Sequence, residues 1–266
     1  MIDVFQLTII GERVNVLLTT KSFGEVHPKR DDFATQLGRL NEVTGKEAIL
    51  FPQLAFTNQF VEGDATQEGN IETFPDAQGN LLEGFLRSPF KADAGISTSL
   101  PVGICNGDCP VGIILTTPDS IGQRKLALMH LGLMSMISKT GRTSLIEETV
   151  QAIRQQGLEV EAFWMGFGAE SCCYGLGHGD DRWPIIEQWQ PEMVEVTKGP
   201  RQGDRGVDLG IIATNQLLAL GIPAEKIEVN EYCTCCSGNA PEDGQHFSNL
   251  MRHGATARNA VVAWLK

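Results

Sequence analysis

The stretch VGICNGDCPVGIILTT, residues 102–117, decides the fold that we expect. Two short apolar runs, Val102–Cys105 and Val111–Thr117, flank a turn made of Asn106-Gly107-Asp108-Cys109-Pro110. A third run of the same kind, Lys125–His130, follows shortly afterwards. Apolar runs of this length that are bounded by Gly and Pro are typical of buried β-strands. The middle of the chain is therefore predicted to be rich in strands.

Helices are predicted between groups of strands. A first helix is expected to begin at Asp31 or Asp32, a second at the capping box Ser144-Leu145-Ile146-Glu147, and a third at Asp208. Glu62–Asn80, rich in Gly, Asp, Glu, Gln and Asn, is predicted to be a long exposed loop or an edge insertion. Strands outnumber helices, and helices interrupt the strand runs. This pattern predicts a layered α/β or α+β fold, with residues 1–266 as a single domain.

Composition narrows the range of partners. The 266 residues carry a formal net charge of −12, and no cluster of Lys and Arg stands out. Nucleic acids and anionic membranes are therefore not expected partners, since binding to them depends on basic surfaces. No apolar run reaches the roughly 18 residues of a membrane span, and the N-terminus does not resemble a signal peptide. We therefore expect a cytoplasmic protein whose seven cysteines are thiols or metal ligands.

Cys109 and His130 are the first candidates for chemistry. Cys109 lies in the turn before one predicted strand, and His130 ends another. If those strands are neighbours, a thiolate and an imidazole meet at one point. They can then bind zinc or copper, or form a pair of nucleophile and base. A buried cysteine and a hydrogen-bonded core histidine remain the simpler interpretation, and a metal would need a third ligand.

Two further segments contain closely spaced Gly or Cys. The glycines of Gly166–Gly177 can bring backbone N–H groups to an anion such as phosphate, although Gly-rich turns are common. The adjacent Cys172 and Cys173 are expected to diverge and not to chelate one metal. Cys233-Thr234-Cys235-Cys236 suggests a zinc knuckle but lacks a second Cys pair at finger spacing. A structural zinc site is therefore not the favoured interpretation there.

Taken in order, these segments resemble the laccase-domain family, also called multicopper polyphenol oxidases. The resemblance covers nearly the whole chain. Its members are regarded as purine nucleoside phosphorylases that also have adenosine deaminase and methylthioadenosine phosphorylase activity. The resemblance implies one α/β domain with a mixed β-sheet and flanking helices, a fold similar to that of a toxin deamidase. The matching segments are Lys91–Gly95, Gly107–Val111, His130–Gly132, Gly166–Gly177, Asp208–Leu220, Cys233–Cys236, Phe247-Ser248 and Thr256–Ala260.

The resemblance also implies a metal site with an incomplete ligand set. The family holds zinc with His, Cys and His, and Cys109 and His130 match two of these ligands. The metal implied by the resemblance is zinc, alternatively copper. Because the first His appears as Ala55, a site without metal is the other expectation. A replacement ligand would come from His27, Cys105, His246 or the Cys233–Cys236 group.

The resemblance implies substrate-binding residues as well. They are Arg258, Gly166, Gly168 and Ser248. The family's Trp-Arg dipeptide is replaced by Leu133-Met134, and losing an Arg removes a bidentate donor for phosphate or ribose.

Three functions follow from these residues. The first is a zinc-dependent purine nucleoside phosphorylase or adenosine deaminase-like enzyme that binds a nucleoside and phosphate at Cys109 and His130. The second is a metal-free thiol hydrolase or deamidase, with Cys109 as nucleophile and His130 as base. The third is a non-catalytic descendant that binds a nucleoside or a protein. The sequence leaves the oligomeric state open.

Overall fold

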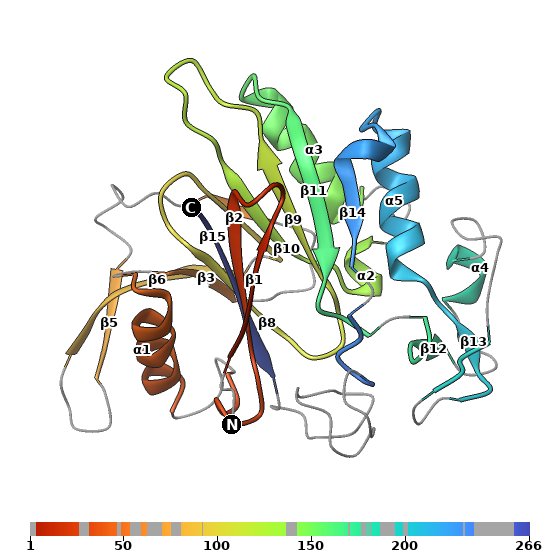
Figure 1. Ribbon diagram of the computed structural model, residues 1–266, viewed down its shortest axis with the longest axis horizontal. Coiled ribbons are helices and arrows are strands. Elements are labelled where there is room, and N and C mark those ends of the chain that lie inside the picture. Colours follow the sequence, from red (N-terminus) through yellow and green to blue (C-terminus); the bar gives the residue numbers. More distant parts are fainter. Residues whose placement is uncertain are drawn as a thin grey trace.

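The computed structural model describes residues 4–26, 32–46, 49–53, 60–62, 71–75, 81–91, 93–136, 143–169, 171–176, 180, 182–186, 195–198, 202–230, 232–236 and 258–266. Two mixed β-sheets pack against each other, and helices cover their outer faces (Figure 1). The α/β class expected from the sequence is confirmed. The predicted mixed sheet is present twice, and the apolar inner faces of the two sheets cover each other.

The first sheet has seven strands in the order β1-β2-β15-β8-β3-β6-β5. Strands β8, β3 and β6 run parallel, and the other neighbours are antiparallel. The strands are β1 (Val4–Ile9), β2 (Val14–Thr19), β15 (Asn259–Leu265), β8 (Val102–Asn106), β3 (Ile49–Gln53), β6 (Leu81–Lys91) and β5 (Ile71–Pro75).

The second sheet has six strands in the order β14-β11-β9-β10-β7-β4. Its central strands β11, β9, β10 and β7 are antiparallel, and β14 and β4 join its edges in parallel. The strands are β14 (Ile227–Val229), β11 (Val160–Gly166), β9 (Val111–Thr116), β10 (Leu126–His130), β7 (Ala94–Ser97) and β4 (Phe60–Glu62). A separate pair joins β12 (Gly175–Leu176) to β13 (Arg205–Gly206).

Side chains alternate between two cores along each strand, as the pleat of a strand requires. In β10, Leu126 and Leu128 face the core between the sheets, whereas Ala127 and Met129 face the helices. The short α2 (Leu133–Met136), α3 (Leu145–Gln155) and α5 (Leu209–Ala219) contribute to the core on the outer face of the second sheet.

The remaining helical segments are α1, α4 and one 3-10 turn. α1 (Phe33–Thr44) covers the outer face of the first sheet, α4 spans Trp183–Ile186, and a 3-10 turn spans Ala224–Lys226. Among the described residues, no helix has the length and apolar character needed to cross a lipid bilayer.

The helix termini follow the sequence signals closely. Ser144 Oγ accepts the Glu147 N–H at 3.2 Å, and Asp208 Oδ1 accepts the Ile211 N–H at 2.9 Å. Asp32 precedes α1, but its side chain makes no capping hydrogen bond. Side-chain caps of this kind satisfy backbone donors that a helix leaves unpaired, and each contributes about 1 kcal/mol.

One expectation about a loop is wrong. The sequence predicts an exposed loop or an edge insertion over Glu62–Asn80, and of these the loop is contradicted, because Ile71–Pro75 forms the edge strand β5, paired antiparallel with β6. Ile71 and Phe74 alternate poorly with their polar neighbours, so the segment lacks a clear strand pattern. Pairing with β6 supplies the hydrogen bonds that the local sequence does not predict.

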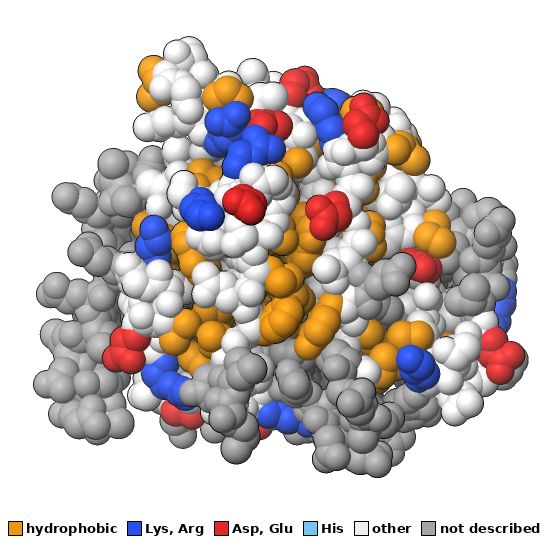
Figure 2. Space-filling model, viewed as in Figure 1, with side chains coloured by type: hydrophobic (Ala, Val, Ile, Leu, Met, Phe, Trp, Pro, Cys, Tyr) orange, Lys and Arg blue, Asp and Glu red, His pale blue; other side chains and the backbone are white. Residues whose placement is uncertain are grey.

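An apolar strip lies on the surface along one side of the core between the two sheets. Half-buried Phe5, Leu7, Ala162 and Tyr232 pack against the core between the sheets, and Figure 2 shows hydrophobic side chains over β1 and β11 there. The rings of Phe5 and Tyr232 stack with centroids 5.4 Å apart. This stacking fixes the start of the segment 232–236 on the β-sandwich.

Candidate active site at Cys109 and His130

Cys109 and His130 lie at the same end of β9 and β10, two neighbouring central strands of the second sheet. Cys109 comes just before β9 and His130 is the last residue of β10, where it pairs with Val111. The Leu131 N–H donates to Pro110 O at 2.8 Å, which continues the pairing beyond the strands. Because β9 and β10 are antiparallel, the start of one meets the end of the other.

The two side chains converge on Gly132. A Cβ atom at Gly132 would lie 3.1 Å from Cys109 Sγ and 3.0 Å from His130 Cε1. Gly132 therefore leaves the space in which both side chains pack. The structure brings together the two residues that the sequence selected, while their catalytic or metal-binding roles stay predictions.

Burial controls the ionisation of both groups. Desolvation raises the pKa of Cys109 to about 12. The Asp108 carboxylate raises this pKa further, and the positive charge of Arg258 opposes the shift. Desolvation also lowers the pKa of His130 to about 4. The negative charge of Asp93 opposes this shift, and the positive charge of Arg258 adds to it. Near neutral pH the pair is therefore a thiol and a neutral imidazole.

Arg258 supplies positive charge at the end of the strands where Cys109 and His130 lie. It precedes β15, and its charge lowers the pKa values of both Cys105 and Cys109, which places it near the candidate pair. The Val26 N–H donates to Arg258 O at 2.9 Å, so the backbone at this point is held in place. A half-buried guanidinium is the group that proteins use most readily to bind phosphate.

Gly166 and Gly168 are needed for packing. A Cβ at Gly168 would lie 2.5 Å from Pro110 Cβ, and one at Gly166 would lie 2.6 Å from Trp164 Cη2. The Ala169 N–H donates to Asp108 O at 2.7 Å. Gly168 lets the segment after β11 lie directly on the turn that carries Cys109, whereas Gly166 leaves room for the Trp164 ring. The role of both glycines in binding substrate stays a prediction.

Several predicted residues lie outside the described part of the chain. They are Ser248, Ala55, His27 and His246. At the positions of the family's Trp-Arg dipeptide, Leu133 is buried and Met134 is exposed at the start of α2. Sequence reasoning missed Asp93 and Asp108, whose charges act on His130 and Cys109. Asp108 immediately precedes Cys109, and Asp93 immediately precedes β7, which pairs with β10; these positions are the signal that could have indicated them.

Zinc fits this pair only in part. Thiol and imidazole donors suit zinc, and catalytic zinc normally has three protein ligands. Within the described ranges, no His, Cys, Asp or Glu joins Cys109 and His130 to form a group of three potential ligands. These residues therefore do not complete a zinc site. The described part of the chain does contain one group of this kind, formed by Cys172, Cys173, Cys233 and Cys236.

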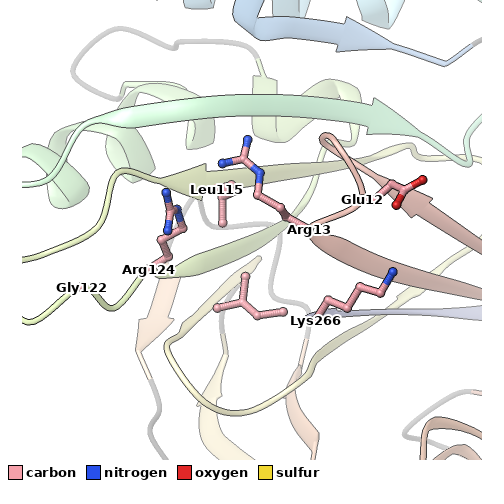
Figure 3. Close-up of a pocket in the computed structure, with 7 residues that line it drawn as sticks. Glu12, Arg13, Leu115, Gly122, Arg124 and Lys266 are labelled. Carbon is pink, nitrogen blue, oxygen red and sulfur yellow. The ribbon is translucent and has the colours of Figure 1, made fainter.

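A separate cavity lies toward the other end of β9. It has a volume of about 430 Å³ and is lined by Glu12, Arg13, Leu115, Gly122, Arg124, Leu265 and Lys266 (Figure 3). Arg13 and Arg124 both pair with Glu161, Arg124 at 2.8 Å, so one carboxylate partly compensates the two guanidinium charges. Leu115 and Cys109 lie toward opposite ends of β9, and the cavity is not part of the Cys109–His130 site.

Comparisons with known proteins agree with this architecture. The family described as multi-copper polyphenol oxidoreductase laccase matches residues 38–266, and the chain belongs to this family. The solved structure of the hypothetical protein YfiH from Bacillus licheniformis is similar, with a TM-score of 0.66 and 17% identity over 95% of this chain and 93% of that one.

Two more solved structures share the fold. YlmD from Geobacillus stearothermophilus has a TM-score of 0.62 and 17% identity, and covers 95% of this chain and 92% of its own. The Neisseria meningitidis protein NMB0706 has the same TM-score and identity, with both chains fully covered. No curated protein matches the chain. The resemblance drawn from the sequence is thereby confirmed for family and fold.

Proposed function

We propose that this chain is a purine nucleoside phosphorylase whose site surrounds Cys109, His130 and Arg258. Hydrogen phosphate would attack the anomeric carbon of the ribose while the bond to the purine nitrogen breaks, and its proton would pass through solvent to that nitrogen, giving ribose 1-phosphate and the free purine. The observation that carries the proposal is the meeting of half-buried Cys109 and buried His130 at Gly132, close to Arg258, whose neighbour Asn259 pairs with Asn106 at the start of the same turn. Membership of the laccase-domain family supports it.

Arg258 would hold the phosphate. A guanidinium offers two parallel N–H donors to two phosphate oxygens, and such pairs are stronger where water is partly excluded. The bound phosphate would then lie beside the developing positive charge of the ribose. Arg258 thus orients the nucleophile and keeps it desolvated.

His130 and Cys109 would contact the substrate as neutral groups. The low pKa of His130 keeps the imidazole uncharged near neutral pH, so that it offers one N–H donor and one acceptor. Cys109 would donate weakly through its S–H. Because these two residues do not complete a zinc site among the described residues, the proposed reaction uses only the chain's own side chains and phosphate.

The test is a phosphorolysis assay on the purified chain. Adenosine, inosine and guanosine are each incubated with phosphate, and free purine and ribose 1-phosphate are measured; inosine formed from adenosine would reveal deamination. Arg258→Ala should lower kcat/KM roughly 100-fold, mainly by raising KM for phosphate. Arg154→Ala, which removes a surface arginine paired with Glu159, is the matched control. Turnover that is unchanged in Arg258→Ala would refute the proposal.

One rival has support in the structure. Met134, exposed at the start of α2, stands where the family has Arg, which favours a descendant that binds nucleosides without turning them over. Calorimetric binding of a nucleoside, combined with no turnover of any of the three substrates, would favour this rival. The metal-free thiol enzyme is disfavoured, because the raised pKa of Cys109 opposes formation of a thiolate.

A further inference from the structure

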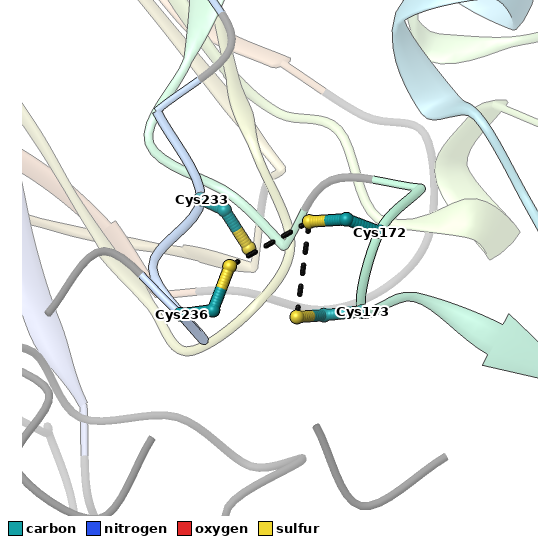
Figure 4. A group of neighbouring side chains, drawn as sticks. All are labelled: Cys172, Cys173, Cys233 and Cys236. Carbon is teal, nitrogen blue, oxygen red and sulfur yellow. Dashed lines mark hydrogen bonds between the residues drawn. The ribbon is translucent and has the colours of Figure 1, made fainter. Parts of the chain in front are cut away.

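Four cysteines from two distant segments meet beside the candidate active site. Cys172 and Cys173 lie in the turn after β11, and Cys233 and Cys236 lie in the segment 232–236. Their sulfurs all lie within 4.8 Å of one another. Figure 4 shows the side chains of Cys233 and Cys236 directed across the gap between the two segments toward Cys172 and Cys173. The expectation that Cys172 and Cys173 diverge is therefore wrong.

Backbone contacts hold the two segments together. Gly168 and Cys233 form a parallel bridge, and the Thr234 N–H donates to Gly168 O at 2.8 Å. The Thr197 N–H and the Lys198 N–H both donate to Cys172 O, at 3.1 and 2.8 Å. The cysteines are thus placed by contacts that do not involve their sulfurs, so the group is preorganised for a ligand.

The distances between the sulfurs fit one tetrahedral ion. Cys172 Sγ lies 3.8 Å from Cys173 Sγ and 3.6 Å from Cys236 Sγ. Around a zinc ion with Zn–S bonds of about 2.3 Å, tetrahedral geometry separates two sulfurs by about 3.8 Å. A disulfide would instead need about 2.05 Å between them.

The chemistry of the donors selects the ion. Four thiolates arranged as a tetrahedron are typical of zinc or of iron–sulfur centres. All four sulfurs lie within 4.8 Å of one another, which suits one ion and is too compact for cysteines spread over the iron atoms of a cluster. A single iron ion is the alternative, and measurement of the bound metal separates it from zinc. Binding of zinc would displace the thiol protons to solvent, and the two positive charges of the ion would compensate part of the thiolate charge.

We propose that Cys172, Cys173, Cys233 and Cys236 bind one structural zinc ion, in a site separate from Cys109 and His130. The ion fastens two segments that both contact the turn carrying Cys109. Ala169 donates its N–H to Asp108 O at 2.7 Å, and Thr234 Oγ1 donates to Gly107 O at 3.4 Å. Zinc would therefore keep that turn in place without contacting substrate. The proposal does not depend on the phosphorylase activity.

Metal content of the purified full-length chain tests the proposal. Zinc and iron are measured per chain in the wild type, in Cys172→Ala and in Cys236→Ala, with Cys235→Ala as the matched control. Cys235 is buried in the same segment but is not one of the four ligands. Cys109→Ala separates this site from any metal at the active site.

The expected result is one zinc per chain in the wild type, in Cys235→Ala and in Cys109→Ala. Affinity for zinc should fall roughly 100-fold or more in Cys172→Ala and Cys236→Ala, since each removes one of four ligands. Zinc content that is unchanged in both variants, iron in place of zinc, or a disulfide within the group would overturn the proposal.

X-ray absorption on the wild type keeps the test valid if the variants fail to fold. A zinc spectrum fitted by four sulfurs at about 2.3 Å supports the assignment. A spectrum dominated by nitrogen or oxygen ligands, or zinc-free wild type that also fails to bind added zinc under reducing conditions, refutes it.

Discussion

The Cys109–His130 pair and the four-cysteine group share one short piece of backbone but differ in almost every chemical respect. Segment 166–169 contacts the turn of Cys109, where Gly168 lies against Pro110. Through a β-bridge, Gly168 also pairs with Cys233 of the four-cysteine group. The pair has only two potential metal donors, the Cys109 thiol and the His130 imidazole, and the charge of Arg258 acts on the imidazole. The four-cysteine group has four equivalent sulfurs in a compact set. The proposed site for chemistry has an incomplete set of metal ligands, whereas the proposed site for stability has the four ligands of a closed zinc site.

Alkylation should separate the two sites most sharply. With a pKa near 12 instead of 9.0, Cys109 should react with iodoacetamide near pH 7 about 1000-fold more slowly than a free cysteine. Chelation should raise this rate only through loosening of the turn that carries Cys109, whereas Cys172 and Cys236, as zinc ligands, should become reactive only after zinc is removed. Peptide mapping by mass spectrometry measures all three rates. Fast alkylation of Cys109 before chelation would restore the thiol enzyme as a candidate.

Acid should destabilise the active-site region through His130. Its pKa is about 4 in the folded chain and 6.5 ordinarily, so the unfolded chain binds more protons between these values. Stability is therefore complete above pH 6.5 and should fall by up to about 3 kcal/mol as the pH drops toward 4. Urea unfolding at pH 7 and pH 4.5 measures the loss.

The variant His130→Asn is the control for that prediction. It lacks the imidazole, so its stability should fall less steeply with acid, while any loss caused by acid release of zinc from the cysteines is shared with the wild type. Equal slopes for the two proteins would show that His130 is not buried as a neutral group.

Two glycine substitutions give the smallest effects and the finest comparison. Gly168→Ala would push a Cβ against Pro110 at 2.5 Å and should cost roughly 2–3 kcal/mol of stability. Because its segment touches both sites, zinc affinity and turnover should both fall.

Gly132→Ala places a methyl group 3.0 Å from His130 Cε1, so it should cost about 1 kcal/mol or less and leave zinc affinity intact. Thermal unfolding and zinc titration of the two variants measure these effects. A loss of zinc affinity in Gly132→Ala would show that the two sites are not independent.

The sequence predicts local features well because their causes are local. The helix starts at Ser144 and Asp208 depend on side chains within three residues, and the strand that ends at His130 depends on its own apolar run. The convergence of Cys109 and His130 follows once β9 and β10 are taken as neighbours. These parts of the fold and site could be anticipated from single segments.

Other features depend on pairings between distant segments. The four-cysteine group requires the contact between Gly168 and Cys233, which no local pattern encodes. The division into two sheets depends equally on which apolar faces meet. The spacing of Cys172-Cys173 and Cys233–Cys236 does not match a zinc finger, so spacing alone argued against the site. Only the tertiary arrangement brings these sulfurs together.

The position of β15 has a consequence for how the chain is made. This last strand lies between β2 and β8, so the first sheet has two unpaired inner edges until residues 259–265 have left the ribosome. Exposed strand edges recruit other chains, and pairing over such a separation is slow. Nascent chains that stall before Asn259 should therefore need chaperones, and ribosome-bound chains of increasing length should resist protease only once β15 has emerged.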